Sequence, residues 1–278
     1  MPVPTLLELA ESGAHFGHHK SMVYPKAQGY IYSIKNNVAL INLEQTQDAI
    51  SRAQKVIGGA LANNQTVLFV GTKRSTREAT KAVAESVNSP YITERWYGGT
   101  LTNFSTMLGN IKKMNEIEAF LATEAASKLT KKDRLVKENQ FKRLHRFLGG
   151  LAKVTKLPDL IVLATASNDN IAIQEANQLS IPVLAITDTD INPAKITYPI
   201  PANDDAPRAV ELILRAIVEM PAGEKIPSTK SQIPNKGEEV EEITKEEKPK
   251  KVTKAKVATK PKAEKKPAKK VVAKKEKK

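Results

Sequence analysis

Three short runs of apolar residues constrain the fold of this chain most, because none of them alternates apolar with polar side chains. They lie at residues 67–70, 160–164 and 183–186. A strand without alternation is buried on both faces, as in a parallel sheet that helices cover on each side. The sequence therefore predicts a central parallel sheet rather than a half-exposed antiparallel one.

Helical patterns separate these runs along the chain. Apolar residues recur every three or four positions within residues 45–61, 168–179 and 205–220, which is typical of helices that bury one face. The alternation of strands with helices predicts right-handed strand–helix–strand units. The expected fold class is therefore α/β, a three-layer α/β/α sandwich.

Two segments depart from this alternation. Residues 30–33 and 38–42 flank an Asn-Asn pair and predict an added β-hairpin.

Residues 102–147 hold two helical patterns and no strand, with Thr130 and Asp133 resembling a capping box at the start of the second helix. Their apolar stripe has coiled-coil spacing and consists of Met107, Ile111, Met114, Phe141, Leu144, Leu148 and Leu151. We predict an antiparallel helical hairpin that projects from the sheet domain; a helix pair packed flat on the body is the alternative.

Positive charge is concentrated in two parts of the chain. The net charge is +14 and the isoelectric point about 9.7, which indicates a polyanionic partner. Residues 221–278 hold 19 lysines and 9 glutamates, and residues 104–147 hold 10 basic against 5 acidic residues. The lysine-rich segment has no apolar periodicity, so we predict a disordered tail that either adds affinity for a polyanion or only solvates the chain. The predicted parts are a sheet domain (1–103 and 148–220), a hairpin insert (104–147) and this tail (221–278).

Composition excludes several kinds of site. The chain has no cysteine, so a disulfide, a thiolate zinc site and a cysteine nucleophile are excluded. Its first residues lack the pattern of a signal peptide, and no apolar run approaches the roughly 20 residues of a membrane span. We therefore expect a soluble cytoplasmic protein that makes no use of a membrane. No Ser-His-Asp set or carboxylate pair stands out, so we predict no catalytic residue, cofactor or small-molecule substrate.

The loop at residues 71–77 is the first candidate binding segment. It lacks the glycine spacing of either common nucleotide-binding loop. It places Lys73, Arg74 and Arg77 beside an expected helix start capped by Ser75 or Thr76, where free amides and the helix dipole favour phosphate. We predict contact with RNA phosphates; a solvated basic turn is the alternative.

A second candidate segment contains the only Trp of the chain, in the run Arg95-Trp96-Tyr97-Gly98-Gly99. A basic residue beside two aromatic rings can stack on RNA bases. Trp96 can equally belong to the core, with the glycine pair as a hinge into the helical hairpin. Both interpretations stay open from the sequence.

Histidines at positions 15, 18 and 19 raise the question of a metal site. His15 and His19 are four residues apart, but Gly13 and Gly17 argue against a helix, and no cysteine or nearby carboxylate completes a ligand set. We predict no metal ion there and a hydrogen-bonded or RNA-facing cluster instead.

Four aspartates, Asp188, Asp190, Asp204 and Asp205, follow the later predicted strands. Carboxylates in such positions can bind magnesium in receiver-type domains. Asn203 and Asp205 also precede Pro207 where helix caps belong. Capping is the interpretation we prefer, and no metal ligand is predicted.

Taken together, a set of motifs resembles the bacterial small-subunit ribosomal protein S-two family. The resemblance runs from about residue 5 to 220 and rests on residues 15–18, 41–46, 69–73, 95–103, 148–150, 157–159, 171–176, 181–183 and 200–206. It implies a flavodoxin-like sheet domain with a coiled-coil hairpin, binding to small-subunit rRNA between head and body, and docking of ribosomal protein S-one. Residues 166–170 depart from the family pattern, and the lysine-rich tail inherits nothing from it.

We therefore expect a structural constituent of the small ribosomal subunit that binds rRNA, supports assembly and translation, and has no enzymatic activity. A nucleotide- or flavin-dependent enzyme and a receiver-like signalling domain are the rival interpretations of the same fold. The candidate RNA-binding residues are His18, Lys20, Lys26, Lys73, Arg74, Arg77, Arg95, Trp96, Tyr97, Asn103, Lys112 and Lys113.

Overall fold

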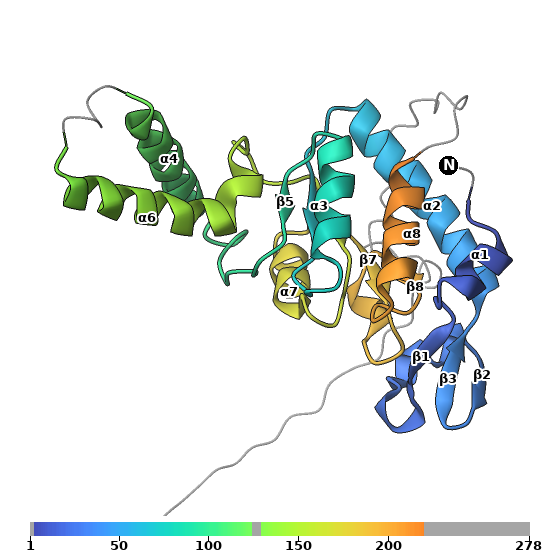
Figure 1. The fold of residues 1–278 in the computed structure, drawn as a ribbon. Helices are drawn as coiled ribbons and strands as arrows, with labels where there is room; N and C mark the ends of the chain where they lie inside the picture. Colours follow the sequence, from blue (N-terminus) through green and yellow to red (C-terminus); the bar gives the residue numbers. More distant parts are fainter. Residues whose placement is uncertain (1–2, 124–128, 220–278) are drawn as a thin grey trace, which may run out of the picture. The chain divides into compact units, whose positions relative to one another are not determined.

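A five-stranded parallel sheet forms the centre of the protein (Figure 1). The structure is a computed structural model and describes residues 3–123 and 129–219. The strands lie in the order β5-β4-β6-β7-β8, and every neighbouring pair is parallel. Numbered along the chain, this is the 2-1-3-4-5 order of flavodoxin-like sheets, so the predicted fold class is confirmed. The bounds are β4 (Val67–Val70), β5 (Tyr91–Ile92), β6 (Leu160–Leu163), β7 (Val183–Thr187) and β8 (Tyr198–Pro201).

Successive residues of each strand point to opposite faces of the sheet and supply two separate cores. Phe69 packs on one face with helices α2 (Leu43–Ala62), α3 (Arg77–Ser86) and α8 (Pro207–Val218). Leu68 packs on the other face with α7 (Asn170–Gln178). Because both faces are covered, both sets of strand side chains are apolar, which explains the continuous runs in the sequence.

The two outer strands of this sheet were not predicted. β5 has only two residues, too few for a pattern. β8 reads Tyr-Pro-Ile-Pro, and proline is a poor strand residue because it lacks a donor. Proline is tolerated on a sheet edge, and β8 lies on one edge.

At two helix starts the predicted side-chain capping bond does not form. Helix α8 has Ala206 as its N-cap and no side-chain capping bond, while Asn203 accepts a hydrogen bond from the backbone N–H of Asp205 at 2.9 Å. The turn before Pro207 thus closes on itself instead of capping the helix. Helix α3 has Thr76 as its N-cap, but the Thr76 hydroxyl donates to the carbonyl of Lys73 at 3.1 Å instead of accepting from the helix.

A smaller antiparallel sheet precedes the parallel one along the chain. Its order is β1-β3-β2, and β2 and β3 form the expected hairpin. Asn36 and Asn37 take φ values of 51° and 61° in the turn, as a tight hairpin requires. Helix α1 precedes this sheet and begins with a capping box of Thr5 and Glu8. The bounds are α1 (Leu6–Glu11), β1 (Phe16–His19), β2 (Ile31–Lys35) and β3 (Val38–Ile41), with short 3-10 turns η1 (Lys20–Met22), η2 (Pro25–Tyr30) and η4 (Pro193–Lys195).

Helices α4 (Phe104–Leu121) and α6 (Lys131–Leu148) form the predicted helical pair (Figure 1), and the turn η3 (Gly149–Leu151) follows them. The predicted cap at Thr130 is confirmed, since its hydroxyl accepts from the N–H of Asp133 at 3.2 Å. Leu151, expected on the helical stripe, lies in η3 instead. No helix of the described residues, these two included, has the length and apolar content needed to cross a membrane.

The base of the helical pair belongs to the core on the α7 face. Ile111, Met114 and Leu148 are buried there. Farther along α6, Leu135 and Val136 are 54% and 58% exposed. The division into a sheet domain and a separate hairpin stays a prediction, and the predicted tail of residues 221–278 lies outside the described residues.

Candidate nucleic-acid interface

Lys73 lies at the carboxyl end of β4, where it is paired with acidic groups. Its ammonium donates to the carbonyl and carboxylate of Asp204, at 3.1 and 3.2 Å, and to the carboxylate of Asp205. Burial opposes the charged ammonium, but the hydrogen bonds and negative charges of these two aspartates outweigh it and raise the pKa of Lys73. Lys73 therefore ties the loop after β4 to the loop after β8.

Arg77 is also used within the protein. Its guanidinium donates to the carbonyls of Thr72 and Glu94, at 3.2 and 3.0 Å, and pairs with the Glu94 carboxylate at 3.3 Å. Arg146 of α6 contacts the same carboxylate at 2.9 Å. Glu94 thus links the start of α3 with the end of α6, and this leaves Arg77 little capacity for an outside phosphate.

His18 lies beside the aspartates that follow β7. Its Nδ1 is 3.1 Å from Asp188, and its Nε2 is 3.6 Å from Asp205. Burial lowers the pKa of His18, but its contact with Asp188 and the nearby acids outweigh this, so the pKa lies above its usual value. His18, Asp188 and Asp190 each offer a ligand atom within 4.8 Å of the others, a donor set that suits a divalent cation. This grouping is not predicted by the sequence, because β1 and β7 are distant in the chain.

Glu175 is the residue that organises the Trp96 segment. The residue is 6% exposed, and its carboxylate accepts hydrogen bonds from the Trp96 indole and from the backbone N–H groups of Gly99, Leu101 and Thr102, at 2.8–3.1 Å. Burial alone would raise the pKa of Glu175, yet these bonds lower it. The carboxylate therefore remains charged and fixes the path of the chain into α4.

Trp96 is a core residue, 6% exposed. A buried indole cannot stack on an RNA base, so the structure favours the core interpretation that the sequence left open. Tyr97, in contrast, is 40% exposed and forms an edge-to-face pair with Phe147, with ring centroids 5.4 Å apart. Of the two aromatic side chains, only Tyr97 is available to a partner.

Tyr97 borders a cavity of about 450 Å³ between its own segment and the two long helices. Polar, apolar and aromatic groups mix in its wall, and Arg143 is the one charged residue among the described residues that line it. The lining residues are Tyr97, Gly98, Gly99, Asn103, Thr106, Met107, Asn110, Gln140, Arg143, Leu144, Phe147 and Leu148.

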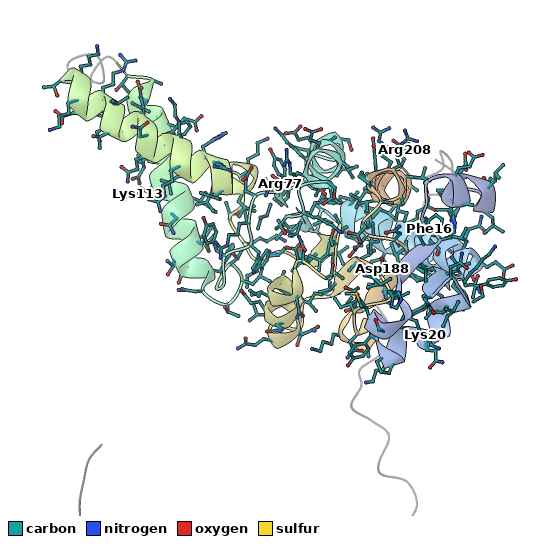
Figure 2. The ribbon with its side chains drawn as sticks, turned by 60° about the horizontal axis from the view of Figure 1, so that its bottom comes forward. Phe16, Lys20, Arg77, Lys113, Asp188 and Arg208 are labelled. Carbon is teal, nitrogen blue, oxygen red and sulfur yellow. The ribbon has the colours of Figure 1, made fainter. Side chains whose placement is uncertain are left out.

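The candidate residues from the sequence do not form a single site. Figure 2 shows Lys113 on the helical pair, Arg77 beside the sheet, and Lys20 near the small sheet. Lys73 and Arg77 are paired internally, whereas Arg95, Lys112 and Lys113 are exposed. Lys20, Lys26, Arg74 and Asn103 are exposed as well, and His18 is partly buried.

Four further residues of this region, Glu175, Asn110, Gln140 and Arg143, are not among the candidates that the sequence predicts. Glu175 had a usable signal, because it lies on the helix face that carries Ala172 and Ala176, where a carboxylate must find partners. The three cavity residues, Asn110, Gln140 and Arg143, have no such signal in the sequence, since they come together only when α4 packs on α6.

The protein belongs to the flavodoxin-like class by its strand order and carries an inserted helical pair. Ion pairs connect the loops at the carboxyl edge of its sheet, so this edge has a structural role. The sequence matches the family described as "Ribosomal protein S2" over residues 9–222. The chain therefore belongs to this family, as predicted. It is a structural ribosomal protein and not an enzyme.

Individual relatives agree with the family match, and each is named "Small ribosomal subunit protein uS2". One in Helicobacter hepaticus is 37% identical over 244 residues, which cover 88% of this chain and 92% of that protein. One in Saccharophagus degradans is 37% identical, covering 87% of this chain and 98% of that protein. One in Gluconobacter oxydans is 41% identical, covering 76% and 80%.

Proposed function

We propose that this protein is a component of the small ribosomal subunit that binds small-subunit rRNA, supports assembly of the subunit and serves translation in the cytoplasm. Membership of the family over residues 9–222 is the observation that carries the proposal. The relatives described above bear the names of small-subunit proteins. The net charge of +14 suits a polyanionic partner.

The RNA-binding surface that we propose lies at the base of the helical pair. Arg143 lies there beside the cavity, and the proposed surface includes Arg95 and the two lysines of α4, Lys112 and Lys113. All four side chains are exposed, and none has an ion pair or hydrogen bond within residues 3–123 and 129–219. Unpaired cations are free to neutralise phosphates, which supplies most of the sequence-independent affinity for RNA. Lys73 and Arg77 have their charges satisfied internally and are weaker candidates than the sequence suggested. Lys20, Lys26 and Arg74 are exposed candidates outside this surface.

A pair of charge reversals tests the proposal. Arg143→Glu changes an exposed arginine beside the cavity, and Arg208→Glu changes an exposed arginine on α8 that likewise has no partner in the described residues. Affinity of the full-length protein for purified small-subunit rRNA is measured by filter binding. We expect Arg143→Glu to weaken binding about fivefold or more and Arg208→Glu to change it little, since each lost phosphate contact costs on the order of 1 kcal/mol.

The two possible failures differ. Equal affinities of both variants would place the RNA contact elsewhere on the protein. A wild-type protein that neither binds the rRNA nor sediments with small subunits would overturn the proposed function itself.

The proposal includes docking of ribosomal protein S-one, which the family resemblance implies. Exposed apolar side chains near the small sheet support a protein partner. Tyr32 is 76% exposed, Met22 57% and Phe16 50%. We expect Tyr32→Ser to weaken capture of purified ribosomal protein S-one, with Leu135→Ser, at an exposed apolar residue of α6, as the control. Unchanged capture would remove this surface from the proposal.

A further inference from the structure

We propose that the cavity beside Tyr97 binds one unstacked nucleotide of the rRNA. The proposal rests on the proposed RNA-binding function and names the chemistry of one contact within it. The cavity lies between the Tyr97 segment, α4 and α6, and its volume of about 450 Å³ falls in the range of small-ligand pockets. Sequence-specific proteins usually bind RNA at loops and bulges, where single bases leave the stack.

The electrostatics of the cavity fit a nucleotide. Among the described residues, no carboxylate lines it, and Arg143 supplies one positive charge. A nucleotide has an uncharged planar base and one negative phosphate, so one arginine beside neutral groups matches its charge distribution. Lys113 extends this positive character, because it lies one helical turn after Asn110 on α4.

An aromatic ring is available for stacking. Tyr97 is 40% exposed, and its edge-to-face pair with Phe147 holds the ring at the cavity. Stacking of a base on such a ring contributes to single-strand RNA binding without regard to base identity. The aromatic pair therefore supplies a platform that a solvated loop lacks.

Polar groups in the wall can recognise the edge of a base. The side chains of Asn110 and Gln140 line the cavity, and within the described residues neither has a hydrogen-bond partner. An amide side chain offers both donors and an acceptor, which is the complement of a base edge. Arg143 also has no partner in the described residues and adds further donors.

The site is preformed in this structure. Glu175 accepts from the N–H of Gly99 at 2.8 Å and from the N–H of Leu101 at 2.9 Å, so the backbone beside Tyr97 is fixed. Asn103 accepts a hydrogen bond from the Thr106 hydroxyl at 2.8 Å at the start of α4. A wall that is already ordered loses little entropy when a ligand binds.

Two substitutions test the cavity directly. Tyr97→Ala removes the stacking ring. Gly98→Leu fills space, because a Cβ at Gly98 has no atom within 4 Å and the residue needs no left-handed backbone. Gly109→Leu on α4 is the matched control, since Gly109 has equally open surroundings but does not line the cavity.

The full-length variants are titrated with purified small-subunit rRNA, and their thermal unfolding is followed in parallel. We expect Tyr97→Ala and Gly98→Leu each to lower affinity about tenfold, the loss typical of one stacked base. Gly109→Leu should bind as the wild type does, and all three should still unfold in one cooperative transition.

Ultraviolet cross-linking of the same wild-type complex, followed by mass spectrometry of the peptides, locates the contact. A nucleotide adduct on Tyr97 or on the α4 and α6 peptides that line the cavity is expected. A wild-type protein that does not bind the rRNA would contradict the proposed function. Normal rRNA binding by Tyr97→Ala and Gly98→Leu, without adducts at the cavity, would overturn only this inference. A cross-link from the cavity to another ribosomal protein in place of RNA would overturn it too.

Discussion

Asp169 is a buried carboxyl group at the carboxyl edge of the sheet, 1% exposed. One oxygen accepts a hydrogen bond from the Thr72 hydroxyl at 2.8 Å, and the other has no partner among the described atoms. Burial raises the pKa of Asp169 to about 6. At neutral pH the protein therefore keeps a charged group where a neutral one would be more stable.

Asp169→Asn should change how stability depends on pH. In the wild type, the stability contributed by the neutral carboxyl is fully present below the unfolded pKa of about 3.8 and is lost as pH rises through about 6. Asparagine stays neutral and can still accept from Thr72. We expect the variant to be more stable than the wild type by roughly 1–3 kcal/mol above pH 6, with the advantage disappearing toward pH 4. Urea unfolding at several pH values measures this, and an equal offset at all pH values would contradict it.

Glu175→Gln should loosen the Trp96 segment. Two of the backbone donors, the N–H groups of Leu101 and Thr102, bind the same carboxylate oxygen. Trp96 and Gly99 donate to the other oxygen. Glutamine has only one side-chain oxygen, so it can accept from one of these two pairs of donors but not from both. We expect a loss of about 2–4 kcal/mol and a change in the fluorescence of Trp96, the only Trp. Glu211→Gln, at an exposed ion pair on α8, is the control and should be nearly neutral.

Some residues of the site could be predicted from sequence and others could not. Tyr97 and Arg95 were found because an aromatic–basic run is a local pattern. The sequence predicts Lys73 as a cation free to bind phosphate, because it does not show that Asp204 and Asp205 follow a strand three positions away in the sheet. Asn110 and Gln140 meet only through helix packing, which a linear pattern does not encode.

At the level of elements, the helical pair has a buried base, and the described residues of its far part, such as Leu135 and Val136, are exposed. Replacing residues 119–136 with a short Gly-Ser linker should therefore change the free energy of unfolding by less than about 1 kcal/mol, as exposed segments do. Met114→Ala at the base should cost about 2–5 kcal/mol, because Met114 is fully buried. Thermal and urea unfolding compare the two. Strong destabilisation by the linker would show that the far part belongs to the main core.

The elements that the sequence predicted are those whose burial gives a periodic pattern. β4, β6 and β7 lie inside the sheet and are buried at every position, and their apolar runs predict them with nearly correct bounds. β5 and β8 lie at its edges. An edge strand can be as short as the two residues of β5 or can contain two prolines as β8 does, and neither gives a strand pattern in the sequence. β1 is not predicted, because its sequence Phe-Gly-His-His has no apolar pattern and none of its residues is fully buried.

For the whole molecule, we expect the charge beyond residue 220 to contribute to the salt dependence of rRNA binding. Residues 221–278 contain 19 lysines and 9 glutamates. Truncation after Met220 should flatten the salt dependence of rRNA affinity, since each phosphate neutralised contributes a log–log slope of roughly 0.7–0.9. It should leave the unfolding transition in place. Titration of both proteins over a salt series measures the slope, and identical slopes would mean that these lysines do not contact RNA.

Neither edge strand of the parallel sheet, β5 or β8, can readily pair with a strand of another chain. At one border β8 carries Pro199 and Pro201, which lack donors, and at the other β5 has two residues. Gly150 of η3 also approaches the carbonyl of Tyr91 so closely that a Cβ would collide with it, which covers that border. Exposed strand edges are the usual starting points of aggregation. A chain awaiting incorporation into a larger particle therefore has a built-in protection against self-association through its sheet.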